Sequence, residues 1–274
     1  MTIMNVNFIE SIRHFFQKHT IIFIICISIA MVSLWILFSY LLNPIQGQYV
    51  AVAIASLGIW LFGYLNKLGF RKGNLLKGLQ YASPVLAGSL YSLILSIQYV
   101  KQYKLYIPES YRIASIIFQM LGIGLFEEIL FRAILLNTII YIFRENKRNI
   151  YYAIIISSAL FGLVHLSNLI NRPEILIGTI SQVIYTTTMG VLYSIIYIKC
   201  KNIWSTIIIH ALFNLMGVFP FIFLRVNYWL IIHYFLNMHS KSLIALLDSI
   251  LSIPCWVYIL YLFKKLEINK NEKG

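Results

Sequence analysis

The chain has 274 residues, of which 60% are hydrophobic and only 11% are charged, and its mean hydropathy is +0.80. A soluble domain carries roughly 25% charged residues, so this composition argues against a soluble enzyme and favours an integral membrane protein. The net charge is +13, and the Lys and Arg residues lie mainly in short loops between apolar runs. Basic loops of this kind orient membrane proteins, so nucleic-acid binding is the weaker interpretation. The cysteines, Cys26, Cys200 and Cys255, form no CxxC pair and indicate neither a disulfide framework nor a thiol nucleophile.

Eight apolar runs approach or exceed the roughly 20 residues that a membrane-spanning helix requires. The first run lacks the small-residue cleavage site of a signal peptide, so we expect it to be retained as a span. We predict an all-α, polytopic integral membrane helix bundle in a single domain, 1–274. A short apolar stretch at Tyr228–Met238 leaves counts of seven or nine spans open. The eight runs are 21–42, 49–65, 79–99, 113–142, 152–170, 175–198, 203–224 and 242–263.

The distribution of basic residues predicts the orientation of the bundle. With the N-terminus inside, 15 of the 22 Lys and Arg residues lie in the inner segments and six in the outer loops, while Arg132 lies within the fourth span. Inner loops of membrane proteins carry the excess of Lys and Arg, so we expect a multi-pass protein of the cell membrane with both termini in the cytoplasm. No internal repeat stands out, which weakens an inverted-repeat transporter.

The fourth apolar run carries three ionisable side chains at its centre, in the segment Phe126–Arg132. Charges at bilayer depth are expensive and are usually paired, turned away from lipid, and functional. Glu128 and Arg132 are four residues apart on one helix face, so we expect them to form a structural pair. Glu127 is rotated by about 100° from Glu128 and is left without a full partner, which suits a general base.

Two later runs each carry a central histidine. His165 follows Phe161 by one turn, and we expect the two rings to pack side by side. His210 and Asn214 are four residues apart and present two hydrogen-bonding groups to one side of the seventh span. Imidazole and carboxamide can both donate to a developing oxyanion, as in sites of acyl transfer.

Three short motifs in these runs give a specific resemblance. EEILFR fits EExxxR, FGLVH fits FxxxH and HALFN fits HxxxN, in that order, within a motif-bearing core at 113–224. The ordered triple resembles the motifs of the CAAX-protease and bacteriocin-processing (Abi) family of intramembrane endopeptidases. The resemblance implies that Glu127 and His165 activate the attacking water, and that His210 and Asn214 hold the scissile carbonyl oxygen as it becomes negative.

The same resemblance implies supporting roles for Glu128 and Arg132 and hydrolysis without a covalent acyl-enzyme. The family has been described both as metalloproteases and as glutamate-dependent proteases. If a metal such as zinc is present, its ligands would be Glu127, His165 and His210. The sequence contains no HExxH motif, and we favour water activation without a metal or other cofactor.

The expected substrate is a small peptide or a membrane-associated protein, including a prenylated one, and the expected surroundings are membrane lipid. Two other classes of function remain open from the sequence. One is a non-catalytic scaffold or bacteriocin-immunity protein that retains the fold. The other is a proton-coupled transporter that uses Glu127 and His165 as relays.

Glu127 and His210 lie at different distances from the inner ends of their helices. Glu127 precedes Arg144 by 17 residues, about 25 Å along a helix, whereas His210 follows Asn202 by eight residues, about 12 Å. The two side chains can meet only if the fourth helix is long, tilted, and protrudes at the inner end.

Overall fold

The computed structural model describes residues 10–11, 14–15, 18–71, 73–101, 108–143, 146–171, 173–223 and 253–266. Every regular element within these ranges is helical, which confirms the predicted all-α class. The elements are α2 (Thr20–Leu41), α3 (Pro44–Leu61), α4 (Leu75–Val100), α5 (Ser110–Glu128), the π-helix η1 (Ile129–Leu136), α6 (Asn137–Phe143), α7 (Lys147–Leu163), the 3₁₀ segment η2 (Val164–Ser167), α8 (Asn168–Asn171), η3 (Pro173–Ile175), α9 (Leu176–Cys200), α10 (Ile203–Val218), η4 (Phe219–Phe223) and α13 (Ile253–Lys264).

Seven of the eight predicted spans coincide with helices. Five helical stretches are long and apolar enough to cross a membrane, and α4, with 26 residues, and α10, with 16, account for two more. The stretch Tyr228–Met238 and the first half of the predicted span 242–263 lie outside the described residues, and α13 covers the second half. The five stretches are Thr20–Leu41, Pro44–Leu61, Ser110–Phe143, Arg148–Ile170 and Pro173–Cys200.

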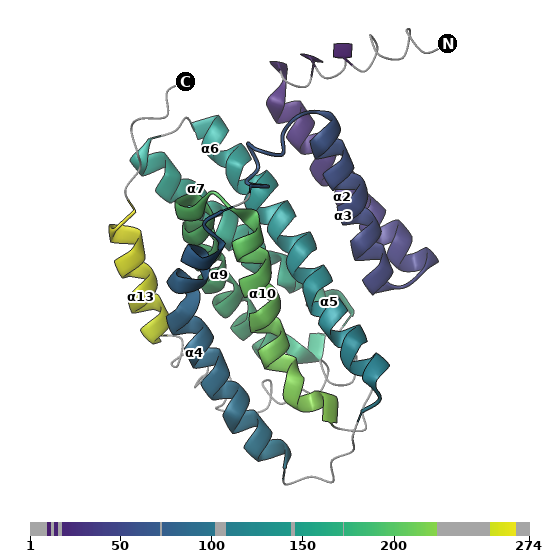
Figure 1. Cartoon of the computed structure of the whole chain (residues 1–274), viewed down its shortest axis with the longest axis vertical. Helices are drawn as coiled ribbons and strands as arrows, with labels where there is room; N and C mark the ends of the chain where they lie inside the picture. The colour runs from purple at the N-terminus through teal and green to yellow at the C-terminus, as the bar shows by residue number, and fades with distance from the viewer. Residues whose placement is uncertain are drawn as a thin grey trace.

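The helices form a bundle in which α5, α7, α9 and α10 lie between two flanking layers (Figure 1). The α2–α3 hairpin flanks α5 on one side, and α13 lies on the opposite side against α9. The described faces of α2 and α7 expose many large apolar side chains, including Ile29 and Ile36 on α2 and Ile155 on α7. These faces suit a hydrocarbon environment, and the chain is a membrane protein.

The basic segments of the described chain gather at one end of the bundle (Figure 1). Asn202, which caps α10, donates from Nδ2 to the carbonyl of Arg71 at 3.1 Å, and Asn74 donates to the carbonyl of Cys200 at 3.2 Å. Lys199 donates from Nζ to the carbonyl of Lys265 at 2.8 Å. These bonds tie the segments before α4, after α9 and after α13 together, and we call this the basic end.

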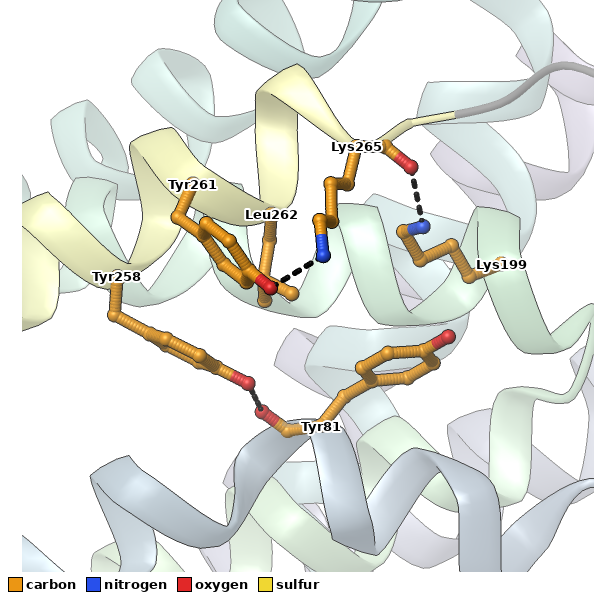
Figure 2. A pocket seen from close by; sticks show the side chains of 6 residues that line it. All are labelled: Tyr81, Lys199, Tyr258, Tyr261, Leu262 and Lys265. Carbon is orange, nitrogen blue, oxygen red and sulfur yellow. Dashed lines mark hydrogen bonds between the residues drawn. The ribbon is translucent and has the colours of Figure 1, made fainter.

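The last described helix, α13, is bonded to its neighbours at the basic end. Tyr258 on α13 donates from Oη to the carbonyl of Tyr81 on α4 at 2.7 Å, as Figure 2 shows. Tyr151 at the start of α7 donates to the carbonyl of Phe263 at 3.2 Å. The helix is therefore held by bonds to α4, α7 and α9, although it lies more than 50 residues from α9 in sequence.

Glycines allow the inner helices to approach closely. A Cβ atom at Gly124 on α5 would lie 3.0 Å from the carbonyl oxygen of Ile207 on α10. On α7, a Cβ atom at Gly162 would lie 2.8 Å from the carbonyl oxygen of Val183 on α9 and would also meet Thr187. Small residues at membrane-helix crossings let the two backbones approach each other in this way.

Substitution of Gly162 by alanine tests the α7–α9 crossing. We expect Gly162→Ala to destabilise the protein by about 1–3 kcal/mol, because the added methyl group must displace backbone. Gly88→Ala on α4 is the matched control, since a Cβ atom there meets nothing within 4 Å and alanine favours a helix. Thermal unfolding in detergent measures both variants, and equal unfolding temperatures would contradict the close crossing.

Candidate active site

The two glutamates lie where a long helix changes its hydrogen-bonding pattern. The stretch Ser110–Phe143 runs for 34 residues, about 50 Å. The long fourth helix that we predicted from the depths of Glu127 and His210 is therefore present. Its α-helical part ends at Glu128, and the π-helix η1 follows at once. Ser157 on α7 donates to the carbonyl of Phe131 in this segment at 3.1 Å. π-Helical segments are rare and often occur at functional sites.

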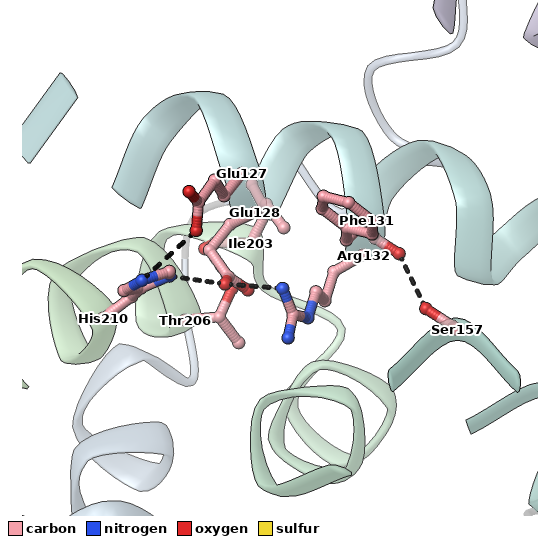
Figure 3. A network of polar contacts seen from close by, with 8 residues as sticks. All are labelled: Glu127, Glu128, Phe131, Arg132, Ser157, Ile203, Thr206 and His210. Carbon is pink, nitrogen blue, oxygen red and sulfur yellow. Dashed lines mark hydrogen bonds and ion pairs between the residues drawn. The ribbon is translucent and has the colours of Figure 1, made fainter. Parts of the chain in front are cut away.

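Glu128, Arg132 and His210 form a buried network (Figure 3). Arg132 donates from Nη1 to Glu128 Oε1 at 2.9 Å, and both side chains are fully buried. This bond confirms the pairing that the spacing predicted. His210 Nδ1 lies 2.8 Å from the same Oε1 atom, across the interface between α5 and α10. One carboxylate therefore joins the long helix to the helix that carries the third motif.

Aromatic rings enclose the rest of the Arg132 side chain. Its guanidinium carbon lies 4.2 Å from the ring centre of Phe161 on α7 and 5.3 Å from that of Tyr193 on α9. A cation over a ring face gains electrostatic stabilisation that partly replaces hydration. Within the described residues, Arg132 Nε and Nη2, Glu128 Oε2 and Tyr193 Oη have no hydrogen-bond partner. Buried polar atoms without partners are uncommon in native proteins, and their concentration here makes this region the candidate site.

Glu127 differs from its neighbour in access and in partner. Its side chain is 24% exposed, whereas that of Glu128 is fully buried. Glu127 Oε2 lies 3.6 Å from His210 Nε2, so the imidazole stands between the two carboxylates (Figure 3). Glu127 is the carboxylate that an incoming molecule can reach.

His165 lies beside this group. It belongs to the 3₁₀ segment η2, and its ring meets that of Phe161 edge-on with centroids 5.8 Å apart, which confirms the predicted packing. Glu127 and His210 are both close enough to act electrostatically on its imidazole. Its Nε2 atom is buried and has no hydrogen-bond partner among the described residues. The ring is therefore held by packing, with one nitrogen left for another group.

Asn214 lies one turn beyond His210 on α10 and is half-buried. Its side chain makes no hydrogen bond within the part of the chain that the structure describes. The structure thus gathers Glu127, Glu128, Arg132, His165 and His210 at one place, and leaves the carboxamide unpartnered on the adjacent turn.

Tyr193 belongs to the site, although no sequence pattern indicated it. Its ring stacks on His210 with centroids 5.2 Å apart and planes 27° apart, and it is fully buried. With Phe161, which meets His210 edge-on at 6.0 Å, it fixes the imidazole from two sides. Tyr193 lies in no motif, and only the packing of α9 against α10 brings it to the histidine.

The suggested metal ligands, Glu127, His165 and His210, do not form a metal-binding cluster. Among the described residues, no group of three or more His, Cys, Asp or Glu side chains is arranged to hold a metal ion. His210 turns one nitrogen to Glu128 and the other to Glu127, so its ring atoms face carboxylates. His210 Nε2 and Glu127 Oε2 lie 3.6 Å apart, and the metal-free activation of water stays a prediction.

These observations define an all-α membrane protein with a buried centre of carboxylates and imidazoles. Residues 109–216 match the family model described as type II CAAX prenyl endopeptidase, Rce1-like. This segment holds all three motifs, and the match confirms the resemblance to the CAAX-protease and bacteriocin-processing family that the motifs predicted.

Two curated proteins are similar to part of the chain. It is 31% identical over 103 residues to "CAAX prenyl protease 2" of Saccharomyces cerevisiae, covering 34% of this chain and 32% of that protein. It is 30% identical over 88 residues to "Putative membrane peptidase YdiL" of Bacillus subtilis, covering 32% of this chain and 29% of that protein. The chain thus spans about a third of the length of the curated relatives that it matches. No solved structure matches.

Replacement of Arg132 by methionine tests the buried pair. We expect Arg132→Met to lower stability by about 3–5 kcal/mol, because it leaves the Glu128 carboxylate buried without its cation. Arg148→Met, on an exposed arginine at the start of α7, is the control and should change stability little. Thermal unfolding in detergent compares the two variants, and equal losses would show that the buried pair does not stabilise the fold.

Proposed function

We propose that this protein is an intramembrane endopeptidase that hydrolyses a peptide bond by direct attack of water. The observation that carries this proposal is the accessible Glu127 carboxylate beside His165 and His210, above a fully buried Glu128–Arg132 pair. The family match over residues 109–216 supports the same reaction class.

In this mechanism Glu127 acts as the general base. It takes a proton from a water molecule while the water oxygen bonds to the carbonyl carbon, and the carbonyl oxygen becomes negative. The proton then passes to the leaving nitrogen as the carbon–nitrogen bond breaks. His165 lies within electrostatic reach of Glu127, and its Nε2 atom has no hydrogen-bond partner among the described residues, so it is suited to hold the water or to carry the proton.

His210 and Asn214 are proposed to receive the oxyanion. A neutral imidazole carries one hydrogen, whereas the imidazolium carries a hydrogen on both nitrogens. Since Nδ1 is 2.8 Å from Glu128, only the imidazolium can donate to Glu128 and to an oxyanion at once. The unpartnered Asn214 carboxamide, one turn further along α10, supplies a second donor.

The proposed substrate is a small peptide or a membrane-associated protein. The printed name of the yeast relative supports a prenylated protein as one member of this class. The clustering of Lys and Arg at the basic end supports a cytoplasmic location of that end and of both termini. We propose that the substrate reaches the site from there.

Substitution of Glu127 by glutamine tests the proposal directly. Cells expressing the wild type should contain new peptide termini in membranes or medium, and Glu127→Gln should reduce them by about 10²–10⁴-fold, because the amide cannot accept the proton of water. Glu109→Gln is the matched control, since this exposed glutamate precedes α5 and lies outside the site. All three proteins are compared at equal membrane abundance.

Termini that depend on Glu127 and not on Glu109 would establish proteolysis and identify the substrate together. Identical termini in all three, with a deletion phenotype rescued equally by each, would overturn the protease proposal. That result would favour the non-catalytic scaffold or immunity protein.

Removal of metal tests the mechanism separately. We expect cleavage of the identified substrate by purified protein to persist after dialysis against a chelator, because Glu127 and His165 activate water without a metal in this proposal. Metal content measured by mass spectrometry on the same sample provides the control for complete removal. Loss of cleavage that added zinc restores would contradict the metal-free mechanism and leave the protease class intact.

A further inference from the structure

A hollow that is separate from the candidate active site lies at the basic end, between α4, α9 and α13. It has a volume of about 460 Å³, and none of its lining residues belongs to the three motifs. The charged and imidazole side chains of the site described above lie instead on α5, η1, η2 and α10. The lining residues, drawn in Figure 2, are Tyr81, Lys199, Tyr258, Tyr261, Leu262 and Lys265.

Two lysine ammonium groups face this hollow from different helices. Lys199 comes from the last turn of α9, and Lys265 follows the end of α13. The six lining residues include no carboxylate. Lys77, near the start of α4, lies close enough to act with Lys199 on Cys200, so a third cation is near. The hollow therefore concentrates positive charge, and its lining attracts an anion.

The two lysines are held in place. Lys199 Nζ donates to the carbonyl of Lys265 at 2.8 Å, and Lys265 Nζ donates to Tyr261 Oη at 2.5 Å. Each ammonium also lies over a phenol ring, 5.5 Å from the centre of Tyr81 and 4.6 Å from that of Tyr261. Side chains ordered before binding lose less entropy when a ligand arrives.

The position of the hollow favours a phospholipid headgroup over a soluble anion. It lies at the end of the span Pro173–Cys200, the level at which phospholipid headgroups meet a protein. Beside it, α13 exposes Val257, Leu260 and Tyr261, which are 63%, 57% and 50% exposed. These side chains offer an apolar surface along which acyl chains can lie. A soluble anion would use the cations alone, whereas a lipid would use both features.

We propose that this hollow binds the phosphate of an anionic phospholipid headgroup. The phosphate oxygens accept hydrogen bonds from Lys199 and Lys265, and the acyl chains follow the exposed face of α13. Basic pockets between membrane helices at the cytoplasmic side suit such headgroups. The bound lipid bridges α9 and α13 and so stabilises the docking of α13. This inference does not depend on the proposed proteolysis.

The test measures lipid binding by the purified full-length chain. Native mass spectrometry in detergent compares phosphatidylglycerol with phosphatidylcholine for the wild type and for Lys199→Gln/Lys265→Gln. Each basic residue near an anionic headgroup contributes about a factor of six, so we expect phosphatidylglycerol affinity to fall roughly 30-fold in the double variant. The matched control is Lys67→Gln/Lys264→Gln, which removes the same charge from exposed lysines at the basic end that do not line the hollow.

Two further measurements separate loss of charge from misfolding and a lipid from a soluble phosphate. Lys199→Arg/Lys265→Arg should retain binding, which separates loss of charge from misfolding of the glutamine variant, and thermal unfolding is followed for every variant. Soluble glycerol 3-phosphate at the same concentration should not displace the lipid, because it lacks acyl chains. Equal losses in the pocket and control variants would overturn the proposal. Displacement by glycerol 3-phosphate would overturn a lipid site in favour of a phosphate site.

Discussion

The buried carboxylate of Glu128 is the constraint on which the arrangement of the motif-bearing helices depends. A charge inside a low-dielectric bundle must be neutralised nearby, and Arg132 supplies the cation from the same helix. The arginine is itself enclosed by Phe161 of α7 and Tyr193 of α9, while His210 of α10 contacts the same carboxylate oxygen, Oε1, that Arg132 contacts. One ion pair therefore requires four helices to stand in fixed relation. A shift of α7, α9 or α10 would remove a ring or imidazole contact from the buried pair.

The freedom of Glu127 follows from this arrangement. Glu128 contacts Arg132 and one nitrogen of His210, so among the described residues Glu127 pairs only with the second nitrogen of His210, at 3.6 Å. Consecutive residues of a helix point about 100° apart, and this rotation brings one carboxylate inward and the other to the accessible side. The same dipeptide thus supplies an anchor and a reactive group. The π-helix that follows begins at the end of the dipeptide, with its Phe131 carbonyl bound by Ser157 of α7.

The sequence predicted those features that depend on short separations along the chain. The Glu128–Arg132 pair and the Phe161–His165 contact are each four residues apart, and both are present. The first span, expected at 21–42, is Thr20–Leu41 in the structure. A run of about 20 apolar side chains is enough by itself to predict a membrane-spanning helix. The bond between His210 and Glu128 joins residues 82 apart, and no periodicity encodes it. Tyr193 and the π-helix escaped prediction for related reasons: one depends on how α9 packs, and the other has no characteristic spacing of side chains.

The depth of the site follows from the meeting of the long helix with α10. Glu127 precedes position 144 by about 25 Å of helix, and His210 follows the start of α10 by about 12 Å. The contact between Glu127 and His210 puts both at one level, so the end of α6 must extend past the start of α10, as Figure 1 shows at the basic end. This distance of about 12 Å is less than half of a hydrocarbon core about 30 Å thick. Four extended residues span it. Under the proposed function, a peptide tail of that length would reach Glu127 from the basic end.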